Sequence, residues 1–230
     1  MKPVIITIDG PAGTGKSTVA HRLAATLGFE FLDTGAMYRA AALVAIDRDI
    51  APGDGPALAE ALGSVRFRFD WAADPPRTML DDRDVSARIR DRDVSEIVSM
   101  VAAQPEVREV LVRRQRAIAE EHPRLVTEGR DQGSVVFPDA PLRIYLDADV
   151  KERARRRQAQ LASAGRSVDP SAVMSGIRER DRIDSTRPDG PLIRPEGAVV
   201  VDTTRRSEDQ VVECLVSIAR EQLPEAGFTS

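Results

Sequence analysis

The sequence VIITIDGPAGTGKST, residues 4–18, decides the fold. Its first part, residues 4–9, is an apolar run that predicts a buried strand. Its second part matches the phosphate-loop pattern G-x-x-x-x-G-K-[ST], which needs a strand before it and a helix after it. Helically spaced apolar residues over 19–27 predict that helix at residues 17–27. Together the three parts predict a site for a nucleoside triphosphate.

Each part of this loop has a chemical reason. The three glycines let the backbone turn tightly, so that successive N–H groups and the start of the helix aim at one anion. Lys16 should reach the outer phosphates, and the Ser17 hydroxyl should ligate Mg²⁺. The residues expected to bind ATP are Gly10, Pro11, Ala12, Gly13, Thr14, Gly15, Lys16, Ser17 and Thr18.

Length and composition favour one α/β domain with one or two insertions in 230 residues. The net charge of −4 and the aromatic content of 4% disfavour a nucleic-acid partner. No apolar run approaches the roughly 18–20 residues of a membrane span, and no signal-peptide pattern opens the chain. Cys214 is the only cysteine, which excludes an internal disulfide. We expect a soluble, cytoplasmic protein without a membrane partner.

Short apolar runs predict the sheet; they lie at residues 4–9, 29–32, 125–128, 142–146 and 198–201. Helices are expected at 17–27, 36–47 and 150–164, after the cap Asp169-Pro170, and behind the capping box Ser207-x-x-Gln210. This alternation predicts a three-layer α/β fold of the P-loop NTPase type, with five parallel strands and helices on both faces. The phosphate site should lie at the carboxyl ends of the strands.

Residues 64–123 are expected to form an insertion on the substrate side, between core segments 1–63 and 124–230. Alternation over 65–70, followed by short runs at 77–80 and 84–85, predicts a small antiparallel sheet. Helices should follow at 94–103 and 105–121.

One predicted helix, 150–164, carries Arg153, Arg156 and Arg157 on one face. Arginines that meet a transferring phosphoryl group can raise its rate by roughly 10³–10⁵, so we assign these three a catalytic role. Residues 150–168 would then form a lid with a hinge at Gly165. The alternative is a solvated basic helix face.

Polar residues also gather where the predicted strands end. Asp33 and Thr34 follow the second strand, and Arg130 and Asp131 follow the third. Together with Arg39 they suit an acceptor phosphate and an amine or hydroxyl, and Asp33 is a candidate to orient the water shell of the metal. The alternatives are a helix cap at Asp33 and an ordinary ion pair in a turn. No Cys or His cluster suggests another metal, so Mg²⁺ carried with the nucleotide suffices.

Five segments in a fixed order cover nearly the whole chain: GPAGTGKST, DTGAMYRA, VREVLVRRQR, EGRDQGSVVFPDA and RERDRIDSTR. In this order and spacing they resemble the bacterial cytidylate kinases, which are nucleoside monophosphate kinases. The resemblance implies a P-loop core, a CMP-binding insertion, a short arginine lid and a monomer. It also implies transfer of the γ-phosphoryl group of ATP to CMP or dCMP. Gln132 stands where relatives often have Met or Ile.

The resemblance also implies roles for single residues. It places the cytosine ring at Ser99, Arg108 and Asp131, the ribose at Asp184 and Arg180, the acceptor phosphate at Arg39, Arg130 and Arg187, and Thr34 near the acceptor. A carboxylate at position 131 accepts from the N4 amine of cytosine and repels the O4 oxygen of uracil. Asp131 is therefore expected to select the base.

Other interpretations stay open. A P-loop kinase for UMP, AMP or shikimate would share the phosphate loop, although the Arg108 and Asp131 pair and the inserted sheet argue against it. A nucleotide-binding switch should carry an [NT]-K-x-D segment and a D-x-x-G segment, and neither occurs in the sequence. A nucleic-acid-stimulated ATPase is disfavoured by the negative charge and the few aromatic residues.

Overall fold

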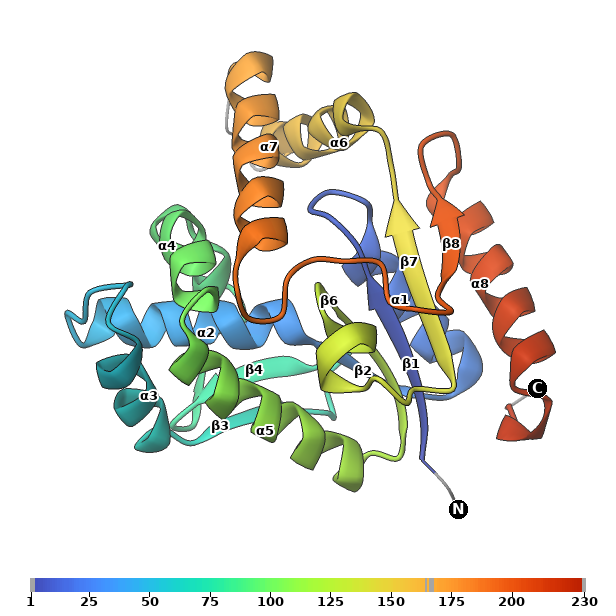
Figure 1. The fold of residues 1–230 in the computed structure, drawn as a ribbon, viewed down its shortest axis with the longest axis horizontal. Helices are drawn as coiled ribbons and strands as arrows, with labels where there is room; N and C mark the ends of the chain where they lie inside the picture. Colours follow the sequence, from blue (N-terminus) through green and yellow to red (C-terminus); the bar gives the residue numbers. More distant parts are fainter. Residues whose placement is uncertain (1–2, 164, 166–167, 229–230) are drawn as a thin grey trace.

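A five-stranded parallel sheet forms the centre of the molecule, in the order β2-β6-β1-β7-β8 (Figure 1). The computed structural model describes residues 3–163, 165 and 168–228. The strands are β1 (Val4–Asp9), β2 (Glu30–Asp33), β6 (Arg124–Gly129), β7 (Leu142–Asp147) and β8 (Val199–Asp202). The predicted five-stranded parallel sheet is confirmed.

Helices cover both faces of the sheet. Neighbouring residues of one strand point to opposite faces, so each strand contributes side chains to both buried layers. Ile6 and Ile8 pack with α1 (Lys16–Leu27) and α8 (Glu208–Gln222). On the other face, Leu125 packs into a larger cluster with α2 (Thr34–Asp47) and α5 (Pro105–Glu121). The three-layer α/β fold predicted from the alternating pattern is therefore confirmed.

The segment between α2 and β6 contains a small antiparallel sheet, as predicted, in the order β3-β4-β5. Its strands are β3 (Phe67–Asp70), β4 (Arg77–Leu80) and β5 (Arg83–Asp84), and α4 (Arg92–Ala102) follows after the short helix η1 (Arg88–Arg90). One further helix, α3 (Gly55–Gly63), was not expected from the sequence. Gly55 and Pro56 resemble a turn, yet the Asp54 side chain caps this helix and Pro56 fits its first turn.

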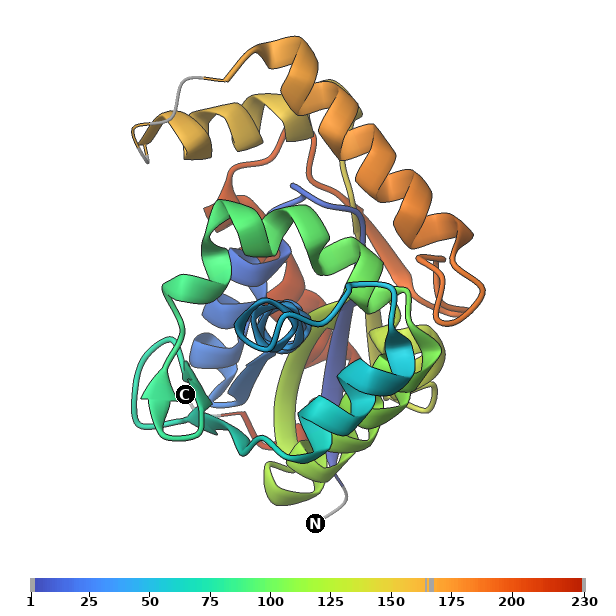
Figure 2. The same cartoon turned by 90° about the vertical axis from the view of Figure 1, so that its left-hand side faces the viewer.

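Helices α6 (Val150–Ser163) and α7 (Pro170–Thr186) form an arm beyond the carboxyl end of the sheet (Figure 2). A small cluster of Ala154, Val173 and Ile177 holds the two helices together. Residues 164, 166 and 167 of the predicted lid segment lie outside the described residues. Among the helices of the described part, none is both long and apolar enough to cross a membrane.

Local chemistry explains the remaining boundaries. Helix α2 begins at Thr34, two residues earlier than expected, because the Asp33 side chain accepts from the Ala36 N–H at 2.9 Å. The predicted capping box is present at α8, where Ser207 and Gln210 bond reciprocally. After β6 the chain makes one turn of π-helix, η2 (Gln132–Val136), and the short helix η3 (Pro224–Ala226) follows α8.

Candidate active site

The phosphate loop joins β1 to α1 with three glycines at positive φ: Gly10, Gly13 and Gly15. A side chain at Gly10 would collide with the backbone of Leu146 on β7, so this position also requires close approach. Lys16 lies along the loop, and its Nζ donates to the Pro11 carbonyl at 2.7 Å. The loop therefore presents its N–H groups and its lysine at one point, at the start of α1.

Lys16 is buried, and its pKa is lowered from the usual value. Burial is the main cause, the Arg130 charge adds to it, and the Glu128 carboxylate opposes it. A bound anion with several negative charges would raise the pKa of Lys16 again, because it would compensate the charges of Lys16 and Arg130 together.

Ser17 contacts a buried acidic residue, Glu128, beside the loop. Its Oγ donates to Glu128 Oε1 at 2.6 Å. Burial and the neighbouring Asp33 carboxylate both raise the pKa of Glu128. A hydroxyl bonded to one carboxylate, with the charge of a second carboxylate nearby, is a donor set that suits Mg²⁺, which prefers oxygen ligands and keeps several waters. Ser17 and Glu128 fit the metal, and Asp33 is held in place by Ala36 N–H and by Arg90 at 3.2 Å.

Asp9, at the end of β1, holds the next segment of the site. Its two carboxylate oxygens accept from the Gln132 and Gly133 N–H groups at 2.8 and 2.7 Å. Burial raises the pKa of Asp9 to about 7, while these two hydrogen bonds lower it. The buried Gln132 side chain bonds Thr127 and Gln115, at 2.9 and 3.0 Å. The Gln132 side chain is thus hydrogen-bonded at both its oxygen and its nitrogen.

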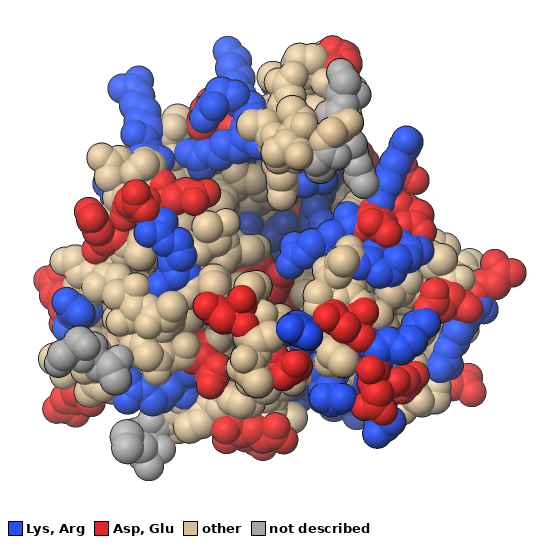
Figure 3. Space-filling model, turned by 180° about the vertical axis from the view of Figure 1, so that it is seen from behind, with Lys and Arg blue, Asp and Glu red and all other residues tan. Residues whose placement is uncertain are grey.

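A cavity, here called the Asp131 cavity, opens between α2, α4, α7 and the end of β6. Seen from behind, the molecule is hollowed here and basic side chains line the hollow (Figure 3). Seven of the residues predicted for the acceptor line it, namely Thr34, Ser99, Arg130, Asp131, Arg180, Asp184 and Arg187. The structure thus brings together residues that lie up to 153 positions apart.

Arg108 lies behind the wall of this cavity and is 1% exposed. Its Nη2 pairs with Asp131 Oδ2, its Nη1 donates to the Tyr38 hydroxyl at 3.1 Å, and its Nε donates to Asp189 at 3.0 Å. Arg187 approaches the same Asp131 Oδ2 at 3.8 Å. Within the described part of the chain, no hydrogen bond reaches Asp131 Oδ1, so this oxygen is left for a ligand in the cavity.

The other arginines form a second group, of which Arg130 and Arg180 line the cavity and Arg39 does not. Arg130 Nε donates to Asp184 at 2.8 Å, and Arg39 donates to Ser95 Oγ at 2.9 Å. Arg180 is half-buried, its buried Nε has no hydrogen-bond partner among the described residues, and its pKa is lowered to about 10 by desolvation and by the Arg130 charge. The neighbouring guanidinium groups of Arg39, Arg130 and Arg180 favour binding of a dianionic phosphate.

The three predicted catalytic arginines of α6 separate in the structure. Arg153 is buried, donates to the Ala12 carbonyl at 3.1 Å and pairs with Asp181 of α7 at 2.5 Å. Arg156 donates to the carbonyl oxygens of Thr14 and Thr203, at 3.3 and 2.5 Å. Arg157 instead donates to Gln160 Oε1 at 2.6 Å along α6, and its positive charge is one of those that act on Arg39 and Arg180.

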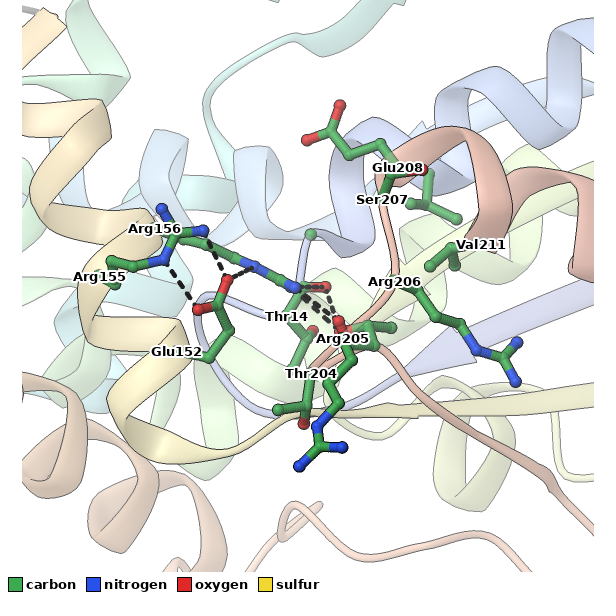
Figure 4. Close-up of a pocket in the computed structure, with 13 residues that line it drawn as sticks. Thr14, Glu152, Arg155, Arg156, Thr204, Arg205, Arg206, Ser207, Glu208 and Val211 are labelled. Atoms are coloured by element: carbon green, nitrogen blue, oxygen red, sulfur yellow. Dashed lines mark hydrogen bonds and ion pairs between the residues drawn. The ribbon is translucent and has the colours of Figure 1, made fainter.

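A second cavity of about 490 Å³, here called the Thr203 cavity, lies on the other side of the phosphate loop. Figure 4 shows Arg156 extending from α6 towards Thr14, beside Glu152, with Arg205 and Arg206 on the far wall. Arg155 and Arg156 lower the pKa of Glu152 to about 2. Two cavities separated by one phosphate loop suit a pair of substrates that exchange a phosphoryl group.

The fold and these two cavities define a P-loop phosphotransferase. Solved structures support the fold: an uncharacterized protein from Eubacterium ventriosum matches with a TM-score of 0.52 at 12% identity. It covers 96% of this chain and 99% of its own. A shikimate kinase from Bacteroides thetaiotaomicron matches with 0.50 at 13% identity, over 96% and 98% of the two chains.

The chain belongs to the cytidylate kinase family, whose model matches residues 6–221. The cytidylate kinase of Caldanaerobacter subterraneus is 47% identical over 91% of this chain and 92% of its own. That of Pelotomaculum thermopropionicum is 48% identical over 92% and 94%, and that of Mycolicibacterium paratuberculosis is 45% identical over 95% and 96%. The predicted resemblance is confirmed, and the protein is a phosphotransferase.

Four residues of the site were not predicted from the sequence: Asp9, Tyr38, Glu128 and Asp189. The sequence pattern predicts Glu128 only as the end of a strand, and its approach to Ser17 depends on the pairing of β1 with β6, in which Ile8 lies beside it. The available signal was its charge, because an acidic residue inside an apolar strand is rarely buried without a partner or a ligand.

Proposed function

We propose that the protein transfers the γ-phosphoryl group of ATP to CMP or dCMP, which yields CDP or dCDP and ADP. The observation that carries this proposal is Asp131, a buried carboxylate in a cavity, with Oδ2 held by two arginines and Oδ1 left for a ligand. Cytosine offers an N4 amine to such an oxygen, whereas uracil offers an acceptor that the carboxylate repels.

The acceptor would fill the Asp131 cavity from one side to the other. Its base would meet Asp131 and Ser99, with Arg108 acting on it from behind Asp131, and its ribose would meet Asp184, which Arg130 holds, and Arg180. Its phosphate would lie among Arg39, Arg130 and Arg187, with Thr34 nearby. Arg187 touches Asp131 and the Gly190 carbonyl, at 3.8 and 2.6 Å, so it would link the base to the phosphate end.

The donor would bind with its phosphates on residues 10–18 and its base and ribose in the Thr203 cavity, against α6 and the start of α8. Loop N–H groups and Lys16 would hold the β- and γ-phosphates. Ser17 and Glu128 would hold Mg²⁺, with Asp33 acting through its waters. Bound together with ATP, Mg²⁺ would supply positive charge that neutralises the charge developing on the phosphates.

The chemistry requires no nucleophile from the protein, because the acceptor phosphate oxygen is already anionic and attacks in line. Positioning and charge neutralisation therefore supply the rate. Lys16 would stabilise the leaving phosphate oxygens, and Arg156 and Arg157 would approach the transferred group from α6. Arg153, which is occupied by Ala12 and Asp181, would hold the loop in place and keep water out of the site.

An acceptor panel tests this function. We expect ADP release from MgATP with CMP and dCMP, and far less with UMP, AMP, GMP or shikimate supplied at the same concentration. An ATP-only reaction controls for hydrolysis. Preference for any other acceptor in the panel would contradict the proposal. Action as a monomer in the cytoplasm stays a prediction.

A further inference from the structure

The turn between α7 and β8 contacts the base end of the Asp131 cavity through two neighbouring residues, Asp189 and Gly190. Asp189 Oδ2 accepts from Arg108 Nε at 3.0 Å, and the Gly190 carbonyl accepts from Arg187 Nε at 2.6 Å. These are the two arginines that approach Asp131 Oδ2. One turn therefore fixes both cations that hold the base-selecting carboxylate.

Space at Gly190 is restricted as well. Its φ is +57°, and an added Cβ would overlap the Arg108 guanidinium and the Asp131 carboxylate. The turn backbone thus packs directly on the Arg108–Asp131 pair, and only glycine fits there.

Charge and geometry assign Asp189 a role. Arg108, Arg187, Asp131 and Asp189 form two cations and two anions, so the cluster is neutral. An arginine can bind a carboxylate through two parallel N–H groups, which would occupy both oxygens of Asp131. The Asp189 bond to Nε and the Tyr38 bond to Nη1 hold the guanidinium in an orientation that engages only Asp131 Oδ2.

We propose that Asp189 is a positioning residue for base recognition: it holds Arg108 away from two-point pairing with Asp131 and so keeps Asp131 Oδ1 available to the amino group of the acceptor base. This inference rests on the proposed function. Asp189 is 44% exposed at its side chain, and it acts on Asp131 through Arg108.

The test is steady-state kinetics of Asp189→Ala and Asp189→Asn with CMP, dCMP and UMP at saturating MgATP. The alanine variant should raise the KM for CMP and dCMP alike by about 10-fold, the loss expected for one charge-assisted hydrogen bond. Its kcat should stay within about 2-fold, and its CMP-over-UMP ratio of kcat/KM should fall. The asparagine variant retains an acceptor at the same place and should recover part of the loss.

Glu196→Ala is the matched control, because Glu196 is an exposed acid in the same α7–β8 segment. The inference is overturned if Asp189→Ala matches this control, or if it weakens CMP and UMP equally while lowering kcat. If the wild-type protein does not phosphorylate CMP at all, the proposed function itself fails. The two failures are therefore distinguishable.

Discussion

At the scale of single residues, the site is built from buried charges that are only partly compensated within the protein. Lys16 and Glu128 are both buried, and burial lowers the pKa of the first and raises that of the second. The half-buried Arg180 has a buried Nε without a hydrogen-bond partner among the described residues. Phosphates and Mg²⁺ would supply the missing partners, so these charges favour substrate binding at the expense of the stability of the free protein.

Replacing Lys16 by alanine tests the donor side. The variant should lose about 10²–10³-fold or more in kcat, because a fixed cation that stabilises the transferring phosphate is gone. It should remain folded, since removing a buried cation also removes its desolvation cost. Turnover with CMP, together with circular dichroism of both proteins, measures the two effects. Normal turnover by a folded variant would refute the assignment.

At the scale of elements, α6 and α7 hold the phosphate loop from above. Arg153 of α6 and Asp181 of α7 pair with each other, and both contact Ala12, the first through its carbonyl and the second through its N–H at 3.4 Å. The Arg153–Asp181 ion pair therefore fastens the arm to the loop, together with the Arg156 bond to the Thr14 carbonyl. The sequence predicted the basic face of α6, but it did not show which arginine faces the loop and which faces the acceptor.

Arg153→Ala should lower the free energy of unfolding by about 2–3 kcal/mol, because it leaves Asp181 without its cation in a mostly buried position. Urea denaturation measures this change. Arg182→Ala is the control on α7, since its pair with Glu179 is exposed and should contribute less than about 0.5 kcal/mol. Equal effects of the two substitutions would rule out the proposed fastening of the arm.

Arg157→Ala tests the acceptor side of the same helix. It should lower kcat by at least about 10-fold, with smaller changes in the KM for CMP, because we assign Arg157 to the transferring group. Lys151→Ala, an exposed substitution in the first turn of α6, should leave kcat unchanged. A loss confined to the KM for CMP would instead assign Arg157 to acceptor binding.

At the scale of the whole molecule, the sheet brings distant segments to one edge. The apolar runs and the phosphate loop were enough to predict five strands and two helix layers, because strands buried on both faces must be apolar throughout. The register between strands was not predictable from local patterns, so the Ser17–Glu128 contact was missed. The contact of Asp189 with Arg108 was missed for a similar reason, since it joins residues 81 positions apart.

Ligand binding should stabilise the whole fold. CMP at about 100 times its Kd should add about 2.7 kcal/mol, which raises the Tm by roughly 5–10 °C for a domain of this size. UMP at the same concentration should produce a much smaller rise, measured by thermal denaturation of the two mixtures. Equal rises would show that the cavity binds the nucleotide without selecting the base.

The central claim is that one buried carboxylate selects cytosine, and the ratio of kcat/KM for CMP to that for UMP in Asp131→Asn tests it most directly. An amide at this position can donate to the O4 oxygen of uracil, so we expect the ratio to fall by at least about 10-fold. Thermal denaturation should show that the variant is folded. An unchanged ratio in a folded variant would contradict the claim.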